Sequence, residues 1–288
     1  MLSGDLTMRD QAATLRALAR RNHGSAHAIA IVSGKGGVGK SSIAVNLAVC
    51  LAVRDVRTLL IDVDMGLANA DLLLGIQPRY TLAHLVSGSR TAAEVLTDGP
   101  GGVRVLAGAS GLHNLADLSE FERQNLIHQL ETIERNTDIA ILDCGAGLSK
   151  NVLSFAMSAD RVFVVTTPEP TALTDAYAMI KALTRESYAG PVCVVVNMAD
   201  SRNEASAVFQ RLASVAGRFL NFSVEDVGYL VHDTSVELAV RARCPFVLKY
   251  PRSNASACIA AVADRVARLI ADTVETRGFF RRVAGLFV

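Results

Sequence analysis

The residues with the clearest chemistry lie in a glycine-rich segment near the beginning of the chain. Residues 33–42 read S-G-K-G-G-V-G-K-S-S and match G-x-x-x-x-G-K-[ST] through Gly34, Gly39, Lys40 and Ser41. Glycines let backbone N–H groups close around phosphate oxygens without clashing β-carbons. The lysine after the last glycine can reach the β- and γ-phosphates, and the hydroxyl that follows can bind Mg²⁺. The segment therefore predicts a phosphate-binding loop.

The same segment also satisfies a second pattern, the dinucleotide-binding turn G-x-G-x-x-G, through Gly34, Gly36 and Gly39. Asp62 ends the next apolar run, about where an acidic side chain would bind the ribose of a dinucleotide. Glycine spacing alone does not separate a nicotinamide or flavin site from a triphosphate site.

Two further features favour the triphosphate site. Lys40 and Ser41 follow the last glycine, and a dinucleotide turn does not use them. A second acid, Asp143, ends the apolar run D-I-A-I-L-D at residues 138–143, and an acid in this position holds Mg²⁺ directly or through water. We therefore expect ATP with Mg²⁺, rather than NAD(P), to raise the melting temperature.

Seven short apolar runs have to position these residues. They are rich in Val and Ile and apolar at consecutive positions, as strands are when both faces of a parallel sheet are buried. Helical patterns alternate with them, which predicts an α/β fold with a doubly wound, mostly parallel sheet. The runs are Ala28–Ser33, Thr58–Val63, Gly102–Ala107, Asp138–Asp143, Arg161–Thr166, Pro191–Asn197 and Asp226–Val231, and helical patterns include Gly39–Val53, Ser119–Arg135, Thr171–Arg185 and Glu204–Ala216.

Composition narrows the class of protein. Half of the 288 residues are hydrophobic, which excludes a mainly disordered chain. The 29 Lys and Arg against 28 Asp and Glu leave a net charge of +1, so direct nucleic-acid binding is not expected. The five scattered cysteines favour reduced thiols in the cytoplasm over disulfides or a zinc site. No apolar stretch reaches the ~20 residues that span a bilayer.

Lys35 adds a further lysine inside the loop, in K-G-G-V-G-K-S, and this form resembles the MinD/ParA family of dimerising P-loop ATPases. The resemblance continues through D-V-D-M-G-L-A-N-A-D-L-L-L-G (62–75), D-C-G-A-G-L-S (143–149) and T-T-P-E-P-T-A-L-T-D-A-Y (166–177), and covers nearly the whole chain. It implies an ATPase that uses Mg²⁺ and acts as a slow switch, with ATP sandwiched in a homodimer.

The resemblance also implies roles for single residues. Lys35 would contact the phosphates of the partner subunit, Lys40 those of its own, and Asp64 would position the attacking water. Ser41, Asp62 and Asp143 would lie at the Mg²⁺, with a structural role as the alternative for Asp62. The nucleotide-binding set would be Gly34, Lys35, Gly36, Gly37, Val38, Gly39, Lys40, Ser41, Ser42, Asn197 and Asp233. Asn197 would read adenine, and backbone near Asp233 would contact it.

The N-terminal residues resemble one particular branch of that family. Residues 5–21 form a helical pattern, and D-Q-A-A-T-L-R within them resembles a motif of the flagellar-number regulators of the FlhG, FleN or YlxH type. In that branch the helix activates the FlhF-type GTPase related to the signal-recognition particle. The match implies that Gln11 activates, supported by Asp10, Leu15 and Arg16. The alternative is an ordinary amphipathic helix docked on its own domain or on a partner.

The C-terminal residues 277–288 form a candidate membrane helix. At 100° per residue the apolar side chains fall within an arc of ~120°, with the arginines outside it. Apolar residues on one face and arginines on the other suit an anionic lipid surface. The alternative is a terminal helix that packs on the core. The apolar set is Phe279, Phe280, Val283, Leu286 and Phe287, and the basic pair is Arg281 and Arg282.

Together these features predict three parts: an activating helix with its linker (1–27), an ATPase domain (28–276) and a membrane-targeting helix (277–288). Two weakly binding tails in one ATP-bound dimer would gain avidity, so the protein would bind the inner face of the cell membrane reversibly. Its partners would be an FlhF-type GTPase, and flagellar C-ring components or a FleQ-type transcription activator. The alternatives are a MinD-type ATPase that places the division septum, a ParA-type DNA partitioner and a transcriptional antiactivator with little turnover.

Overall fold

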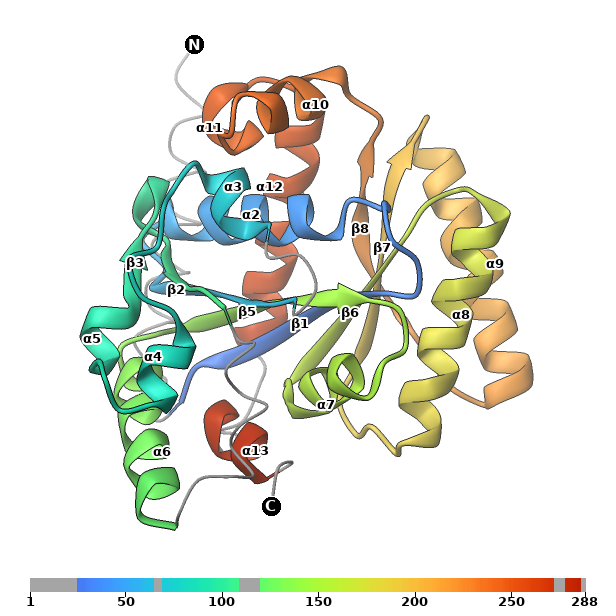
Figure 1. Ribbon diagram of the computed structural model, residues 1–288. Coiled ribbons are helices and arrows are strands. Elements are labelled where there is room, and N and C mark those ends of the chain that lie inside the picture. The colour runs from blue at the N-terminus through green and yellow to red at the C-terminus, as the bar shows by residue number, and fades with distance from the viewer. Residues whose placement is uncertain (1–24, 65–68, 109–119, 272–277, 286–288) are drawn as a thin grey trace.

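A single eight-stranded sheet forms the centre of the computed structural model, which describes residues 25–64, 69–108, 120–271 and 278–285 (Figure 1). The strand order is β3-β4-β2-β5-β1-β6-β7-β8. All pairs are parallel except β3 with β4. The strands are β1 (His27–Ser33), β2 (Thr58–Val63), β3 (Leu96–Asp98), β4 (Arg104–Leu106), β5 (Ile139–Ala146), β6 (Arg161–Thr166), β7 (Val192–Ala199) and β8 (Glu225–Val231).

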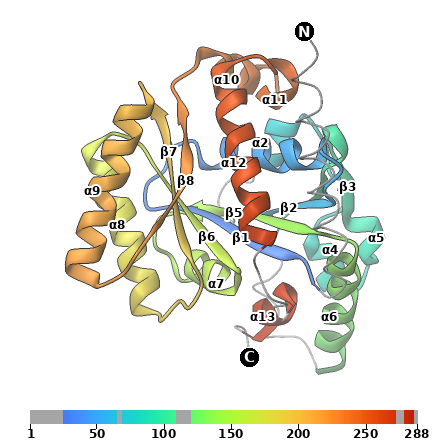
Figure 2. The ribbon, with the colours of Figure 1, turned by 180° about the vertical axis from the view of Figure 1, so that it is seen from behind.

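Helices cover both faces of this sheet (Figures 1 and 2). They are α2 (Lys40–Ala52), α3 (Ala70–Leu74), α4 (Leu82–Val86), α5 (Ala92–Val95), α6 (Glu120–Arg135), α7 (Lys150–Ser158), α8 (Pro170–Arg185), α9 (Arg202–Leu220), α10 (Thr234–Arg241), α11 (Phe246–Lys249), α12 (Asn254–Ala271) and α13 (Phe279–Gly285), with a short 3-10 turn at Pro100–Gly102. Within the described residues, no helix is long and apolar enough to cross a membrane.

The central strands are apolar at consecutive positions because each face meets a different core. In β1, Ala28, Ala30 and Val32 belong to the core under α6, α7, α8 and α9. Ile29 and Ile31 belong to the other core, under α2 and α12. Side chains of a strand alternate between its two faces, so burial of both faces requires the unbroken apolar runs.

The predicted fold class is confirmed, and all seven predicted strands are present. Their ends differ by a few residues, and β4 is the shortest of them because Gly102 lies in the preceding 3-10 turn. β3 was not predicted from the sequence; it is an antiparallel strand of three residues at the sheet edge, with two half-buried side chains and one exposed one. So short and half-polar a strand lacks the apolar run by which the other strands were recognised.

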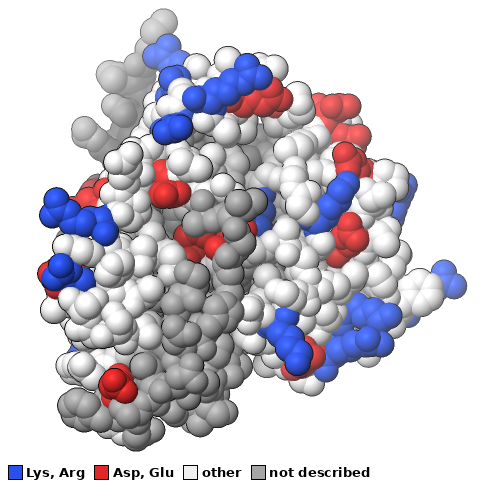
Figure 3. Space-filling view, viewed as in Figure 1, with Lys and Arg blue, Asp and Glu red and all other residues white. Residues whose placement is uncertain are grey.

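The topology explains why the functional residues of different segments meet. β1 lies between β5 and β6, so the chain connects to both sides of it. In open α/β sheets, ligands bind outside the carboxyl ends of the strands where the connections diverge in this way. The loop between β1 and α2 lies at this point. On the molecular face in Figure 3, basic and acidic side chains are interspersed, in line with the net charge of +1.

Candidate nucleotide-binding site

The phosphate-binding loop connects the end of β1 to the first residue of α2, the strand and helix context that the motif requires. Gly37 and Gly39 have φ of 82° and 81°, in the left-handed region that glycine adopts without strain. A Cβ on Gly34 would lie 2.1 Å from the carbonyl oxygen of Asp175, whereas at Gly36 nothing lies within 4 Å. The loop is thus tightly packed at its start and open at its tip, where phosphates can approach.

Lys40 and Asp143 form a buried ion pair at the base of this loop. The Lys40 Nζ lies 2.6 Å from Asp143 Oδ1, and the two side chains are only 7% and 1% exposed. Lys40 also donates to the Ser41 hydroxyl at 3.3 Å. Burial raises the pKa of Asp143, and the charge of Lys40 opposes that rise. The pair therefore brings together the loop lysine, the Ser41 hydroxyl that is predicted to bind Mg²⁺, and the acid of β5.

The second oxygen of Asp143 supports a cation at this place. Asp143 Oδ2 is buried and has no hydrogen-bond partner among the described residues. A buried carboxylate oxygen without a partner is costly unless a cation or water satisfies it. Ser41 and Asp143 offer a hydroxyl and a carboxylate oxygen, the ligand types that Mg²⁺ prefers, so they fit an ion that arrives with a nucleotide. The described residues contain no group of three or more His, Cys, Asp or Glu that could hold a metal ion by itself. Phosphate oxygens and water would complete the coordination.

Asp62 lies beside Asp143 in the register of β2 with β5. Its Oδ1 accepts the backbone N–H of Asp64 at 3.1 Å, and its Oδ2 accepts that of Ala70 at 3.2 Å. Burial and the nearby charge of Asp143 raise the pKa of Asp62 to about 6. These contacts match the structural alternative, in which Asp62 holds the segment after β2, and its role at Mg²⁺ stays a prediction.

Asp64 follows β2 and is half-buried. A Cβ on Gly145 in β5 would lie 3.4 Å from Asp64 Oδ1, so the carboxylate faces the end of β5. Its charge contributes to the raised pKa values of both Asp62 and Asp143. Asp62, Asp64 and Asp143 thus influence one another at the carboxyl ends of β2 and β5, and the role of Asp64 in positioning water stays a prediction.

Lys35 lies at the opposite, exposed side of the loop. Its Nζ donates to Glu169 Oε2 at 2.7 Å and to Thr171 Oγ1 at 3.0 Å, and its side chain is 40% exposed. The charge of Lys35 and its hydrogen bond lower the pKa of Glu169. Glu169 was not predicted as a partner of Lys35, although it lies within the family motif at 166–177.

Asn197 contributes to a cavity of about 380 Å³ next to the loop. Its Nδ2 donates to the backbone oxygen of Val38 at 2.8 Å. The lining is apolar apart from a few polar groups, as in pockets that hold a planar base. It comprises Gly39, Ser42, Ile43, Asn197, Met198, Leu230, Val236, Glu237, Val240, Arg241 and Phe246. The α10 side chains in this lining were not predicted from the sequence. The signal that could have found them is the i, i+4 spacing of Val236 and Val240, which places both on one face of a helix.

Asp233 has a structural use and does not line this cavity. Its Oδ1 caps α10 by accepting the N–H of Ser235 at 2.9 Å, and its Oδ2 accepts the N–H of Ala255 at 3.0 Å. These hydrogen bonds lower its pKa. The carboxylate of Asp233 thus binds the first turns of α10 and α12. Contact between its backbone and a nucleotide stays a prediction.

The two chain ends differ in what the structure describes. Asp10, Gln11, Leu15, Arg16, Leu286 and Phe287 lie outside the described residues. The buried side chains of α13 are Phe279, Phe280 and Val283, each at most 4% exposed, and they belong to the core on the α6 and α7 face of the sheet. The described part of the apolar face expected at a membrane is therefore packed against protein in this conformation.

Polar contacts fix α13 in this position. Glu134 Oε1 of α6 accepts the N–H of Phe279 at 2.7 Å. Arg281 pairs with Glu131, and Arg282 donates to Asp160 Oδ1 at 2.7 Å. Both arginines expected to meet anionic lipid thus have acidic partners on the domain.

Comparison with known proteins shows the family and the fold to which this chain is similar. Residues 26–187 match the model of a family described as an AAA domain. The antiactivator FleN of Pseudomonas aeruginosa is 42% identical over 238 residues, which are 83% of this chain and 85% of that protein. The flagellum site-determining protein YlxH of Helicobacter pylori is 30% identical over 273 residues, 91% of each chain. Among solved structures, the septum site-determining protein MinD of Pyrococcus horikoshii, complexed with Mg-ADP, superposes with a TM-score of 0.68 at 23% identity, covering 86% of this chain and all of that one.

Proposed function

The chain belongs to the MinD/ParA family of P-loop ATPases, and we propose that it is an ATP-driven switch that regulates the number or placement of flagella. The observation that carries the proposal is the similarity to FleN and YlxH along most of the chain, together with the D-Q-A-A-T-L-R segment at 10–16. The MinD-type alternative has the same loop and acids. The N-terminal segment and the higher identity to FleN favour the flagellar branch.

The loop and its acids account for the chemistry of such a switch. Phosphoryl transfer needs neutralised charge and an oriented nucleophile more than covalent catalysis. Backbone N–H groups of the loop and the N-terminus of α2 bind the phosphates, and Lys40 turns from Asp143 toward the terminal phosphate. Ser41 and Asp143 would hold Mg²⁺, and the ion would supply positive charge at the phosphate oxygens. Asp64 orients the attacking water.

Dimerisation would use Lys35. The side chain is exposed at the carboxyl end of the sheet and its partner Glu169 is 65% exposed, so little stability is lost when this ion pair breaks. Once released, Lys35 can extend to phosphates bound by a second copy. A lysine supplied across a dimer makes hydrolysis depend on assembly, which suits a switch rather than a metabolic enzyme.

The decisive experiment concerns the N-terminal segment. We expect a peptide of residues 1–21 to accelerate GTP hydrolysis by the cognate FlhF-type GTPase, and the Gln11→Ala peptide to lose this effect. GTP turnover is measured with the Gln11→Ala peptide as the matched control. Equal rates with and without the wild-type peptide would remove the reason for choosing the flagellar branch over a MinD-type septum ATPase. Binding to C-ring components or to a FleQ-type activator is then measured separately.

Membrane association would require α13 to leave its docked position, because Phe279, Phe280 and Val283 are buried in the domain and cannot contact lipid from there. We expect deletion of residues 279–288 to abolish sedimentation with anionic liposomes in Mg-ATP. We expect Glu134→Ala to increase it about tenfold, because loss of a hydrogen bond to a charged group costs the docked state about 1.5–3 kcal/mol.

The control for the tail is Glu186→Ala, the same charge change at the end of α8. Sedimentation that persists after the deletion, or that rises equally in the Glu186→Ala protein, would contradict the assignment of the tail as a nucleotide-controlled membrane anchor.

A further inference from the structure

The sheet ends in an open strand. Among the described residues β8 has one neighbour, the parallel strand β7, with Val196 opposite Tyr229. The other edge of β8 therefore presents backbone N–H and C=O groups away from the sheet, apart from the N–H of Gly228, which Asp226 accepts. Such an edge is a template for another extended chain. The opposite end of the sheet is different, because there the three-residue β3 covers β4.

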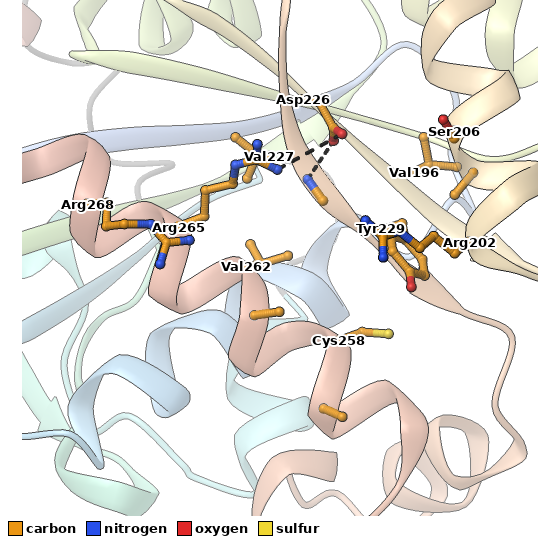
Figure 4. A pocket seen from close by; sticks show the side chains of 14 residues that line it. Val196, Arg202, Ser206, Asp226, Val227, Tyr229, Cys258, Val262, Arg265 and Arg268 are labelled. Atoms are coloured by element: carbon orange, nitrogen blue, oxygen red, sulfur yellow. Dashed lines mark hydrogen bonds and ion pairs between the residues drawn. The ribbon is translucent and has the colours of Figure 1, made fainter. Parts of the chain in front are cut away.

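A groove of about 510 Å³ runs along this open edge. One side is formed by the start of α9 and the other by α12, which pack on opposite faces of the sheet, so the groove lies over the strand edge between them (Figure 4). Small side chains keep it open. These are Ala205, Ser206, Ala257, Cys258 and Ala261, with Gly228 in the strand itself.

The backbone conformation and close packing of Gly228 both favour glycine at this position. Its φ is +136°, and a Cβ there would lie 2.9 Å from Val262 of α12. The strand also carries an irregularity in its register next to this residue. A side chain at 228 would push α12 away from the strand and change the groove.

The charge of the groove is positive. Arg265 and Arg268 project from α12, and Arg202 from the start of α9 on the other side of the groove (Figure 4). The lining contains one acid, Asp226, whose Oδ1 accepts the N–H of Gly228 at 2.9 Å and whose Oδ2 lies 4.0 Å from Arg265. Glu225, next to the groove, pairs with Arg161 at 3.3 Å.

We propose that this groove, defined by Arg202, Arg265, Arg268 and the edge of β8, binds an extended acidic segment of a partner protein. Backbone pairing with β8 supplies affinity, and the arginines select acidic side chains. Tyr229, half-buried in the lining, offers an apolar surface for a side chain of the bound segment. A second copy of this chain does not fit, because edge-to-edge pairing would bring the same arginines face to face. The interface is separate from the nucleotide-binding cavity and independent of the proposed flagellar role.

The test uses the full-length protein and fluorescein-labelled peptides of ten residues, one alternating Val and Glu and one alternating Val and Lys. We expect the acidic peptide to raise fluorescence anisotropy and to bind at least about tenfold more tightly than the basic one. Hydrogen exchange of the backbone N–H groups in 225–231 should slow when the acidic peptide binds. The Arg265→Glu/Arg268→Glu variant should weaken binding about tenfold or more.

The matched control is Arg211→Glu, an exposed arginine of α9 outside the groove. It should bind the acidic peptide as the wild type does, and every variant should keep the wild-type rate of ATP turnover. If the double variant fails to fold, Arg202→Glu takes its place. Equal binding of the two peptides, unchanged exchange in 225–231 with the acidic peptide bound, or an equal loss in Arg211→Glu would each overturn the proposal.

Discussion

A Lys40→Ala protein is expected to lose nucleotide binding, with an affinity for Mg-ATP at least about 100-fold below that of the wild type. The substitution removes the charge that reaches the terminal phosphates, and hydrogen bonds to charged groups contribute about 1.5–3 kcal/mol each. The measurements are titration with a fluorescent ATP analogue and the rise in melting temperature caused by Mg-ATP. A wild-type rise in melting temperature in Lys40→Ala would contradict the assigned role.

The same substitution also affects folding, and the effect depends on pH. Without Lys40, the Asp143 carboxylate stays buried with no cation beside it, which costs about 3–5 kcal/mol of unfolding free energy. Burial already raises the pKa of Asp143, and loss of Lys40 raises it further. A carboxyl group with a raised folded-state pKa is favourable to stability below its unfolded pKa, and that contribution is lost as pH rises through the folded pKa. We therefore expect Lys40→Ala to be more stable at pH 5 than at pH 7.5.

A double variant separates the two effects. Lys40→Ala/Asp143→Asn removes the unpaired charge together with the lysine, so its melting temperature should recover toward that of the wild type at pH 7.5. Its nucleotide binding should stay absent, because the phosphate contact is still missing. Recovery of both properties would mean that Lys40 acts on folding alone.

The central sheet and the phosphate loop were predictable from the sequence because each depends on local residue types. Strands buried on both faces are apolar at consecutive positions, as in residues 162–165 and 192–196, and the loop needs its glycines, Lys40 and Ser41 within ten residues. Both signals are contained in a short window of the chain.

The missed features depend on contacts between distant segments. Arg281 meets Glu131 and Arg282 meets Asp160, across 150 and 122 residues of chain. An amphipathic pattern at 279–283 is satisfied equally by a lipid surface and by the core of the domain, so periodicity could not choose between them. Asp233 shows the same limit, because its pairing with Ala255 of α12 becomes visible only when the chain is folded.

The second large effect is expected at Asp64, where substitution should separate binding from hydrolysis. Asp64→Ala should lower ATP turnover about 100-fold or more, because an oriented nucleophile supplies much of the acceleration of phosphoryl transfer. ATP affinity should stay close to that of the wild type, since Lys40, Ser41 and the loop are unchanged. Loss of the Asp64 charge also lowers the pKa of Asp143, which keeps that acid ionised for Mg²⁺.

An ATP-bound dimer should therefore accumulate in Asp64→Ala, because the proposed assembly through Lys35 would continue while the hydrolysis that would end it does not. Phosphate release and sedimentation velocity in Mg-ATP measure the two properties in the same sample. Asp71→Ala is the control, the same charge change in α3, where the carboxylate accepts the N–H of Leu72. An Asp64→Ala protein that hydrolyses ATP at the wild-type rate would exclude Asp64 as the water-positioning residue. One that binds ATP and stays monomeric would overturn the dimeric switch, because binding and assembly would then be uncoupled in this chain.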